Sequence, residues 1–79
     1  MNAKKRAALG AERAKWLWWI REAMSDNGKE SYSALAKELN VSDETVRRTV
    51  KGTLHSTSVL DWLRAHGVPE SYLCDPRYM

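Results

Sequence analysis

Only one cysteine, Cys74, is present in this chain, so no disulfide can form within one molecule, which fits a reducing compartment. The longest nearly apolar run, residues 16–20, is far too short to cross a bilayer. The basic residues near the start are not followed by an apolar segment with a small-residue cleavage site. We therefore expect an intracellular, cytoplasmic protein that makes no membrane contact.

Residue patterns that would support catalysis or metal binding are also missing. His55, His66 and Cys74 lack the spacing of metal ligands, and no glycine-rich phosphate loop or serine elbow is present. A chain of 79 residues buries a modest core, which does not favour a large active-site cavity. We expect no enzyme, no cofactor, no metal and no small-molecule substrate.

The charge is mildly positive but unevenly placed. The net charge is +3, with hydrophobic residues at 43% and charged residues at 29%, as in an ordinary soluble globular domain. The first fifteen residues hold five basic side chains and one acidic side chain. Residues 1–10, with Lys4, Lys5 and Arg6, are interpreted as a basic flexible arm. Such an arm suits a polyanionic partner, and a merely solvated chain end is the alternative.

Glycine and proline are few, and they divide the chain into short helical pieces. Residues 11–24 contain neither and predict the longest helix. Further helices are predicted from Ser31 to Leu39 and over residues 43–51, followed by a helix that Thr57 or Ser58 can cap and that runs through Ala65, with a final turn over residues 69–73. No stretch alternates as a strand does. The prediction is an all-α, compact bundle of about five short helices, with one domain over residues 11–73 and a tail over residues 74–79.

The second and third of these helices have the features of a helix-turn-helix. Ser31 and Ser42 are suited to cap their first turns, and Asn40 tolerates the positive φ needed where the chain reverses. Ala36 is small, as required where the next helix crosses closely, and Gly52 ends the third helix. Two short helices joined by about three residues in this way describe the motif.

At this point the sequence resembles the repressor and Cro-like helix-turn-helix family of phages and bacteria. The resemblance covers residues 16–73, and it is carried by Leu35-Ala36-Lys37-Glu38-Leu39-Asn40-Val41-Ser42, Thr45-Val46, Gly52, Val59-Leu60-Asp61-Trp62-Leu63, Gly67-Val68 and Leu73. Three positions depart from the family pattern: Asn40 replaces the usual glycine, Thr49 an apolar residue of the inner face, and His66 a leucine.

The resemblance implies contacts with double-stranded DNA. The side chains expected to face the bases of the major groove are Asp43, Glu44, Arg47 and Arg48, and those expected near phosphates are Tyr32 and Lys51. Independent chemistry agrees for the arginines, which can offer two donors to guanine, and for the backbone N–H groups at Ser31, which favour a phosphate. The arm adds Lys4, Lys5 and Arg6. For the two acids the alternative is that they offset the positive end of the helix dipole.

The tryptophans suggest a further surface. Trp16 and Trp62 fit inward stripes, whereas Trp18 points about 160° away from the buried face of its helix and Trp19 lies near its edge. We interpret Trp18 and Trp19, with Glu22, as a dimer or partner interface. The alternative is that the tail, with Tyr72 and Tyr78, folds back over them.

Together these patterns predict a sequence-specific DNA-binding transcriptional regulator, repressor-like and homodimeric, located on the nucleoid if the host is bacterial. The alternative is a protein-interaction module of the same fold, which uses the Trp18 and Trp19 surface and does not bind DNA.

Overall fold

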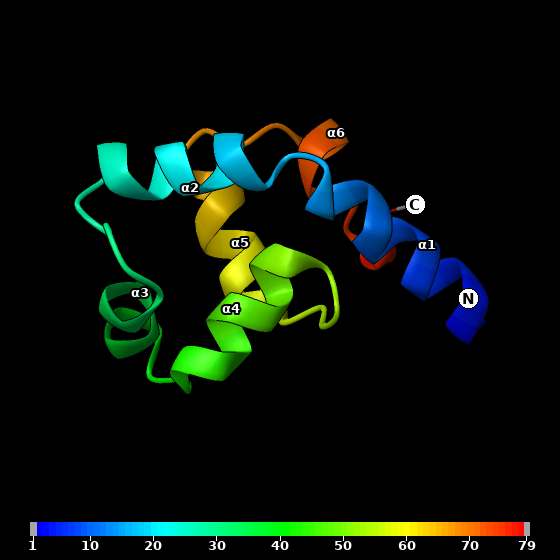
Figure 1. The fold of residues 1–79 in the computed structure, drawn as a ribbon, viewed down its shortest axis with the longest axis horizontal. Coiled ribbons are helices and arrows are strands. Elements are labelled where there is room, and N and C mark those ends of the chain that lie inside the picture. Colours follow the sequence, from blue (N-terminus) through cyan, green and yellow to red (C-terminus); the bar gives the residue numbers. More distant parts are fainter. Residues whose placement is uncertain (1, 79) are drawn as a thin grey trace.

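All regular structure in the part of the chain that the computed structural model describes, residues 2–78, is helical (Figure 1). The α-helices are α1 (Ala3–Ala14), α2 (Leu17–Asp26), α3 (Tyr32–Leu39), α4 (Asp43–Lys51), α5 (Thr57–Ala65) and α6 (Glu70–Leu73), followed by a 3-10 helix, η1 (Pro76–Tyr78). The all-α prediction is confirmed. None of the helices described has the length and apolar character needed to span a membrane.

The long helix predicted over residues 11–24 is wrong, because the chain bends at Lys15 and Trp16. There the N–H of Trp16 bonds to the carbonyl of Arg13, three residues back, and Trp16 leaves helical geometry with φ −100° and ψ 15°. The bend lets the Trp16 ring stack on Tyr72 of α6, with centroids 4.0 Å apart and planes 3° apart. Tertiary contacts thus override the helix propensity of this stretch, and the first helix becomes two.

Residues 3–10 form the first turns of α1 instead of the flexible arm expected for residues 1–10, of which Met1 lies outside the described part. The Asn2 side chain caps the helix by accepting from the Lys5 N–H at 2.8 Å. Gly10 then touches the end of α4, since a Cβ placed on it would lie 1.8 Å from the carbonyl oxygen of Gly52. This backbone contact requires glycine at position 10, and it packs α1 against the rest of the fold.

The core lies where α2, α3, α4 and α5 meet. In Figure 1, α5 runs between α2 and α4, while α3 and α1 lie at opposite ends of the molecule. The fully buried apolar side chains are Ile20, Leu35, Val46, Val50, Val59, Leu60, Leu63 and Leu73. Trp62 is buried and Trp16 packs against the core while partly exposed.

A buried arginine completes the interior, although the sequence predicted only its aliphatic stem on the inner face. Arg13 is fully buried, and its Nε donates to the carbonyl of Leu73 at 2.6 Å. Its Nη1 donates to the carbonyls of Thr49 and Leu54, at 2.8 and 3.0 Å. Its Nη2 lies 2.7 Å from Nδ1 of His55. One side chain thus joins α1 to α4, to the segment after α4 and to α6.

Candidate nucleic-acid interface

The corner between α3 and α4 is built from three residues. Asn40 takes the left-handed conformation, φ 55° and ψ 46°, and the N–H of Val41 reaches back to the carbonyl of Ala36 at 3.0 Å. Ser42 caps α4 by accepting from the Thr45 N–H at 3.1 Å. The predicted caps and the positive φ of Asn40 are therefore confirmed, and the corner fixes the direction in which α4 leaves α3.

The inner face of α4 is fully buried and includes one polar residue. Val46, Thr49 and Val50 are each 0% exposed. The Thr49 hydroxyl donates to the carbonyl of Thr45 at 2.7 Å and accepts from the Ser56 N–H at 3.3 Å. Because the hydroxyl has both partners, a polar residue replaces the expected apolar one without leaving an unsatisfied group in the core.

The outer face of α4 holds every residue predicted to contact bases. Asp43, Glu44 and Arg48 are exposed, and Arg47 is partly exposed. The two acids occupy the first turn and Arg48 and Lys51 the last turn. Charges of these signs at these ends oppose the helix dipole, so they also stabilise the helix itself.

The cations of α4 differ in their partners. Arg47 is paired with the Glu44 carboxylate one turn before it. Within residues 2–78, Arg48 and Lys51 have no carboxylate partner, and Arg48 makes only long contacts to Thr53, at 3.4 and 3.5 Å. Arg48 and Lys51 can consequently bind an anion directly, whereas Arg47 must first break its ion pair with Glu44.

One basic residue of α1, Arg6, lies near the end of α4, a relationship that sequence reasoning missed. Lys4, Lys5 and Arg6 are exposed. Arg6 lines a hollow between α1 and the segment after α4, together with Ala3, Ala7, Gly52, Thr53 and His55. Burial and then the charges of Arg13 and Arg6 lower the pKa of His55. No local pattern links α1 to this segment, since the contact depends on Gly10 and the buried Arg13.

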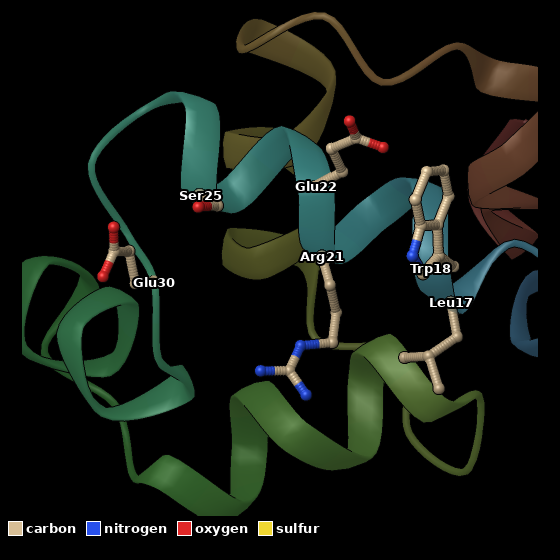
Figure 2. Close-up of a pocket in the computed structure, with 6 residues that line it drawn as sticks. All are labelled: Leu17, Trp18, Arg21, Glu22, Ser25 and Glu30. Carbon is tan, nitrogen blue, oxygen red and sulfur yellow. The ribbon is translucent and has the colours of Figure 1, made fainter.

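The start of α3 confirms the cap predicted at Ser31, but the Tyr32 hydroxyl, predicted to lie near a phosphate, is buried. Ser31 is exposed and caps α3 by accepting from the Ala34 N–H at 3.1 Å. The Tyr32 hydroxyl is buried and has no hydrogen-bond partner, so it does not lie where a phosphate could accept from it. The Arg21 guanidinium lies 4.8 Å from the centre of the Tyr32 ring, and it extends from α2 toward α4 (Figure 2). Arg21 is an exposed cation at this position that sequence reasoning did not single out.

The surface of α2 presents two indoles to solvent. Trp18 is 64% and Trp19 51% exposed, and their rings meet edge to face with centroids 4.8 Å apart. Glu22 is exposed on the same helix. The tail does not cover the indoles: Tyr72 stacks on Trp16, and Tyr78 lies beside the guanidinium groups of α5 and the tail itself. Met79, the last residue of the expected tail, lies outside the described part.

Among the residues described, no group of three histidine, cysteine or acidic side chains could hold a metal ion. The chain matches no protein-family model, no curated protein and no solved structure.

Proposed function

We propose that this protein is a sequence-specific regulator of transcription that binds double-stranded DNA, with α4 in the major groove, and represses by occupying its site. The observation that supports this most is the outer face of α4. The helix is held by a buried inner face, while its outer face carries four charged side chains able to read bases. One of these, Arg48, and also Lys51 have no carboxylate partner within residues 2–78. A single α-helix fits the major groove, where each base pair shows a distinct pattern of donors and acceptors.

Base recognition depends on the arginines in this proposal. Arg47 and Arg48 can each offer two donors to O6 and N7 of guanine. Glu44 then has a second function besides offsetting the dipole: its carboxylate holds Arg47 until a guanine takes its place. Asp43 and Glu44 also disfavour sequences that put acceptors opposite them, and either can accept from cytosine N4.

Phosphate contacts come from both sides of α4. The N-terminus of α3 at Ser31 offers backbone N–H groups, and Lys51 lies in the last turn of α4. Arg6, with Lys4 and Lys5, extends the cationic surface from the end of α4 along α1. Such contacts position the helix on the duplex but do not read its sequence.

The test is binding of labelled duplex DNA, measured by fluorescence anisotropy at several salt concentrations, first with random sequence and then with sites selected from a random pool. We expect the logarithm of affinity to fall linearly with the logarithm of salt, with a slope of about −3 to −6 for roughly three to six neutralised phosphates. We also expect selection to yield a defined motif. No binding to any duplex at low salt would contradict the proposal.

The second candidate function is a protein-interaction module without DNA binding, and the exposure of Trp18 and Trp19 favours it. In that case α4 would be a structural helix with ordinary end charges. One comparison separates the two candidates: substituting Arg48 weakens specific DNA binding in the first, and substituting the two tryptophans abolishes partner binding in the second. As a regulator the protein would act as a homodimer in the cytoplasm, and on the nucleoid if its source is a bacterium or phage.

A further inference from the structure

The side of α2 that points away from the core carries two indoles and two carboxylates. The exposed residues on this side are Trp18, Trp19, Glu22 and Asp26. At about 100° per residue they span roughly 100° of the helix, opposite the buried Ile20. These four residues are named the α2 outer face. Two touching, exposed indoles are uncommon on a free surface and are enriched at interfaces, so this face has the character of a docking surface.

The acidic residues at this face are not neutralised by the rest of the chain. Glu22, Asp26 and nearby Glu30 have no ion-pair partner within residues 2–78. In that part of the chain Asp43, on α4, is the one other acid without such a partner. Three of four unpaired carboxylates thus gather beside the two indoles, although the chain as a whole carries a net charge of +3.

The cations in the neighbourhood of this face have other partners. Lys15 and Lys29 are each paired with a glutamate that does not belong to the face, at 2.8 and 2.9 Å. Arg21 lies over the Tyr32 ring and extends toward α4, away from the indoles (Figure 2). The negative charge of the face is therefore left for a cation from outside the molecule.

We propose that the α2 outer face binds an arginine-rich segment of a partner protein. A guanidinium group stacks on an indole, which is the most favourable aromatic ring for a cation. The same group can donate two parallel hydrogen bonds to a carboxylate, and Glu22 and Asp26 offer one on the same side of the helix as the rings. A lysine ammonium lacks the planar shape for both contacts. An anionic partner is repelled by the carboxylates.

A hollow beside the outer face extends the contact for such a segment. An open cavity of about 570 Å³ lies along α2, lined by Leu17, Trp18, Arg21, Glu22, Ser25 and Glu30 (Figure 2). Trp18 and Glu22 belong to both the outer face and the hollow. A chain that lies across these two residues therefore also reaches the carboxylate of Glu30, which adds a third anionic partner.

The outer face points away from the surface proposed to bind DNA. α2 packs against α4 and α5 with its buried side, so a duplex on the outer side of α4 would leave the indoles accessible. The inference does not rest on DNA binding. It adds a protein partner to the proposed regulator, and it supplies the class of partner for the second candidate function.

Fluorescence anisotropy with a short labelled peptide of alternating arginine and serine tests the proposal. We expect binding at roughly 10–100 micromolar, several-fold weaker binding of the lysine–serine peptide, and none of the glutamate–serine peptide. The positive net charge of the protein disfavours non-specific attraction of a basic peptide. Absence of binding by the arginine peptide at millimolar concentration overturns the proposal, and equal binding of the arginine and lysine peptides overturns stacking on the indoles.

Substitutions locate the binding site. Trp18→Ala/Trp19→Ala and Glu22→Gln/Asp26→Asn should each weaken binding of the arginine peptide about tenfold. Asp43→Asn, which neutralises the unpaired acid on α4, is the matched control and should bind as the parent does. All the substituted side chains are exposed, and circular dichroism checks that the fold is kept. Normal binding by either double variant, or an equal loss in the control, overturns the assignment to the α2 outer face.

The indole N–H signals give a readout that does not depend on affinity. In nuclear magnetic resonance spectra, the signals of Trp18 and Trp19 should move as the arginine peptide is added. The signal of Trp62 should stay in place, because its Nε1 is held by Glu38 at 2.6 Å and its ring is buried. Binding that leaves the Trp18 and Trp19 signals unmoved overturns the proposal. DNA binding is measured separately, so either result can fail without the other.

Discussion

The guanidinium of Arg13 donates a hydrogen bond to the main-chain carbonyl of Thr49, 2.8 Å away and thirty-six residues later in the chain. The same side chain bonds the carbonyls of Leu54 and Leu73. It therefore fixes the last turn of α4 from behind, on the side opposite the candidate base-contacting residues. The direction of α4 depends on a residue in α1, well outside the α3–α4 corner.

Replacing Arg13 should be strongly destabilising. Arg13→Met keeps much of the apolar stem but leaves the carbonyls of Leu54 and Leu73 without their donor, while that of Thr49 keeps only the N–H of Gly52 at 3.2 Å. Each unsatisfied buried group costs about 1–3 kcal/mol, so we expect a total loss of about 3–5 kcal/mol in the free energy of unfolding. Urea denaturation measures it. Arg6→Met, an exposed cation on the same helix, is the control, and a similar loss there would contradict the role assigned to Arg13.

Stability should fall on mild acidification because of His55. Its Nδ1 faces Nη2 of Arg13, so the neutral ring accepts from the guanidinium and a protonated ring would repel it. Burial and the charges of Arg13 and Arg6 place the pKa of His55 in the folded state below its ordinary value of 6.5. The folded state therefore binds a proton less readily than the unfolded chain. The stability due to His55 is complete above pH 6.5 and is lost as the pH falls below it toward the folded-state pKa.

Urea denaturation between about pH 7.5 and pH 5.5 reveals this dependence, because carboxylates such as Asp75 titrate lower. Burial raises the pKa of Asp75, but hydrogen bonds from Arg77 and Arg64 outweigh that effect and hold this pKa at about 2. His55→Gln can still accept from Arg13 through its side-chain oxygen and does not titrate. The variant should show a nearly flat profile over this range. An unchanged slope in the variant would assign the dependence to another group.

The contact between Gly10 and Gly52 should tolerate no side chain. In Gly10→Ala the new methyl would overlap the Gly52 carbonyl, so α1 has to move away from α4, at a cost of about 1–3 kcal/mol or more. Gly28→Ala is a useful comparison, because that position has φ +81° and open space around it. Its cost is backbone strain alone, about 1 kcal/mol. Thermal unfolding should rank Gly10→Ala as the less stable variant, and the reverse order would contradict the packing of α1.

Substituting a base-contacting residue and substituting phosphate-contacting residues should affect DNA binding in different ways. Arg48→Ala should cost about 1–3 kcal/mol on the selected site and relax the base preference there. Lys4→Ala/Arg6→Ala should weaken selected and random duplexes alike and reduce the salt slope by roughly two. Anisotropy titrations on both duplexes measure the difference. If Arg48→Ala keeps full preference, α4 is not the reading helix.

Features that depend on neighbouring residues were predicted well from the sequence. Ser31 and Ser42 cap their helices and Asn40 adopts positive φ, because capping and left-handed turns are decided within four residues. Features decided between distant segments were not predicted. The bend at Trp16 depends on Tyr72, and no periodicity contains that information.

The positions at which the sequence departs from the family that it resembles have the same explanation. His66, in place of a leucine, stacks on Trp62 with ring centroids 3.9 Å apart. The Thr49 hydroxyl donates to the carbonyl of Thr45 and accepts from the N–H of Ser56. These contacts depend on the folded arrangement of the chain, so from the sequence alone both residues looked unfavourable. The position of Arg6 beside the end of α4 was missed for the same reason, since it follows from how α1 packs.

The pair between Glu44 and Arg47 leads to the last prediction. In the free protein the carboxylate neutralises Arg47, and in the proposed complex its negative charge would lie in the repulsive field of the duplex. Glu44→Gln removes that negative charge, keeps the size of the side chain and releases the guanidinium. Random duplex should then bind several-fold more tightly at low salt, because one repulsive charge is gone and one cation is free.

Affinity for the selected site should rise less than affinity for random duplex, because in that complex a base has already replaced Glu44 as the partner of Arg47. The ratio of the two affinities, which is the specificity, therefore falls. Asp43→Asn is the matched control: it removes one negative charge from the same turn without releasing an arginine, since Asp43 has no ion-pair partner within residues 2–78. Equal effects of the two substitutions on specificity would show that only the net charge of α4 matters. A larger loss for Glu44→Gln would show that the ion pair restrains Arg47 until the correct base is present.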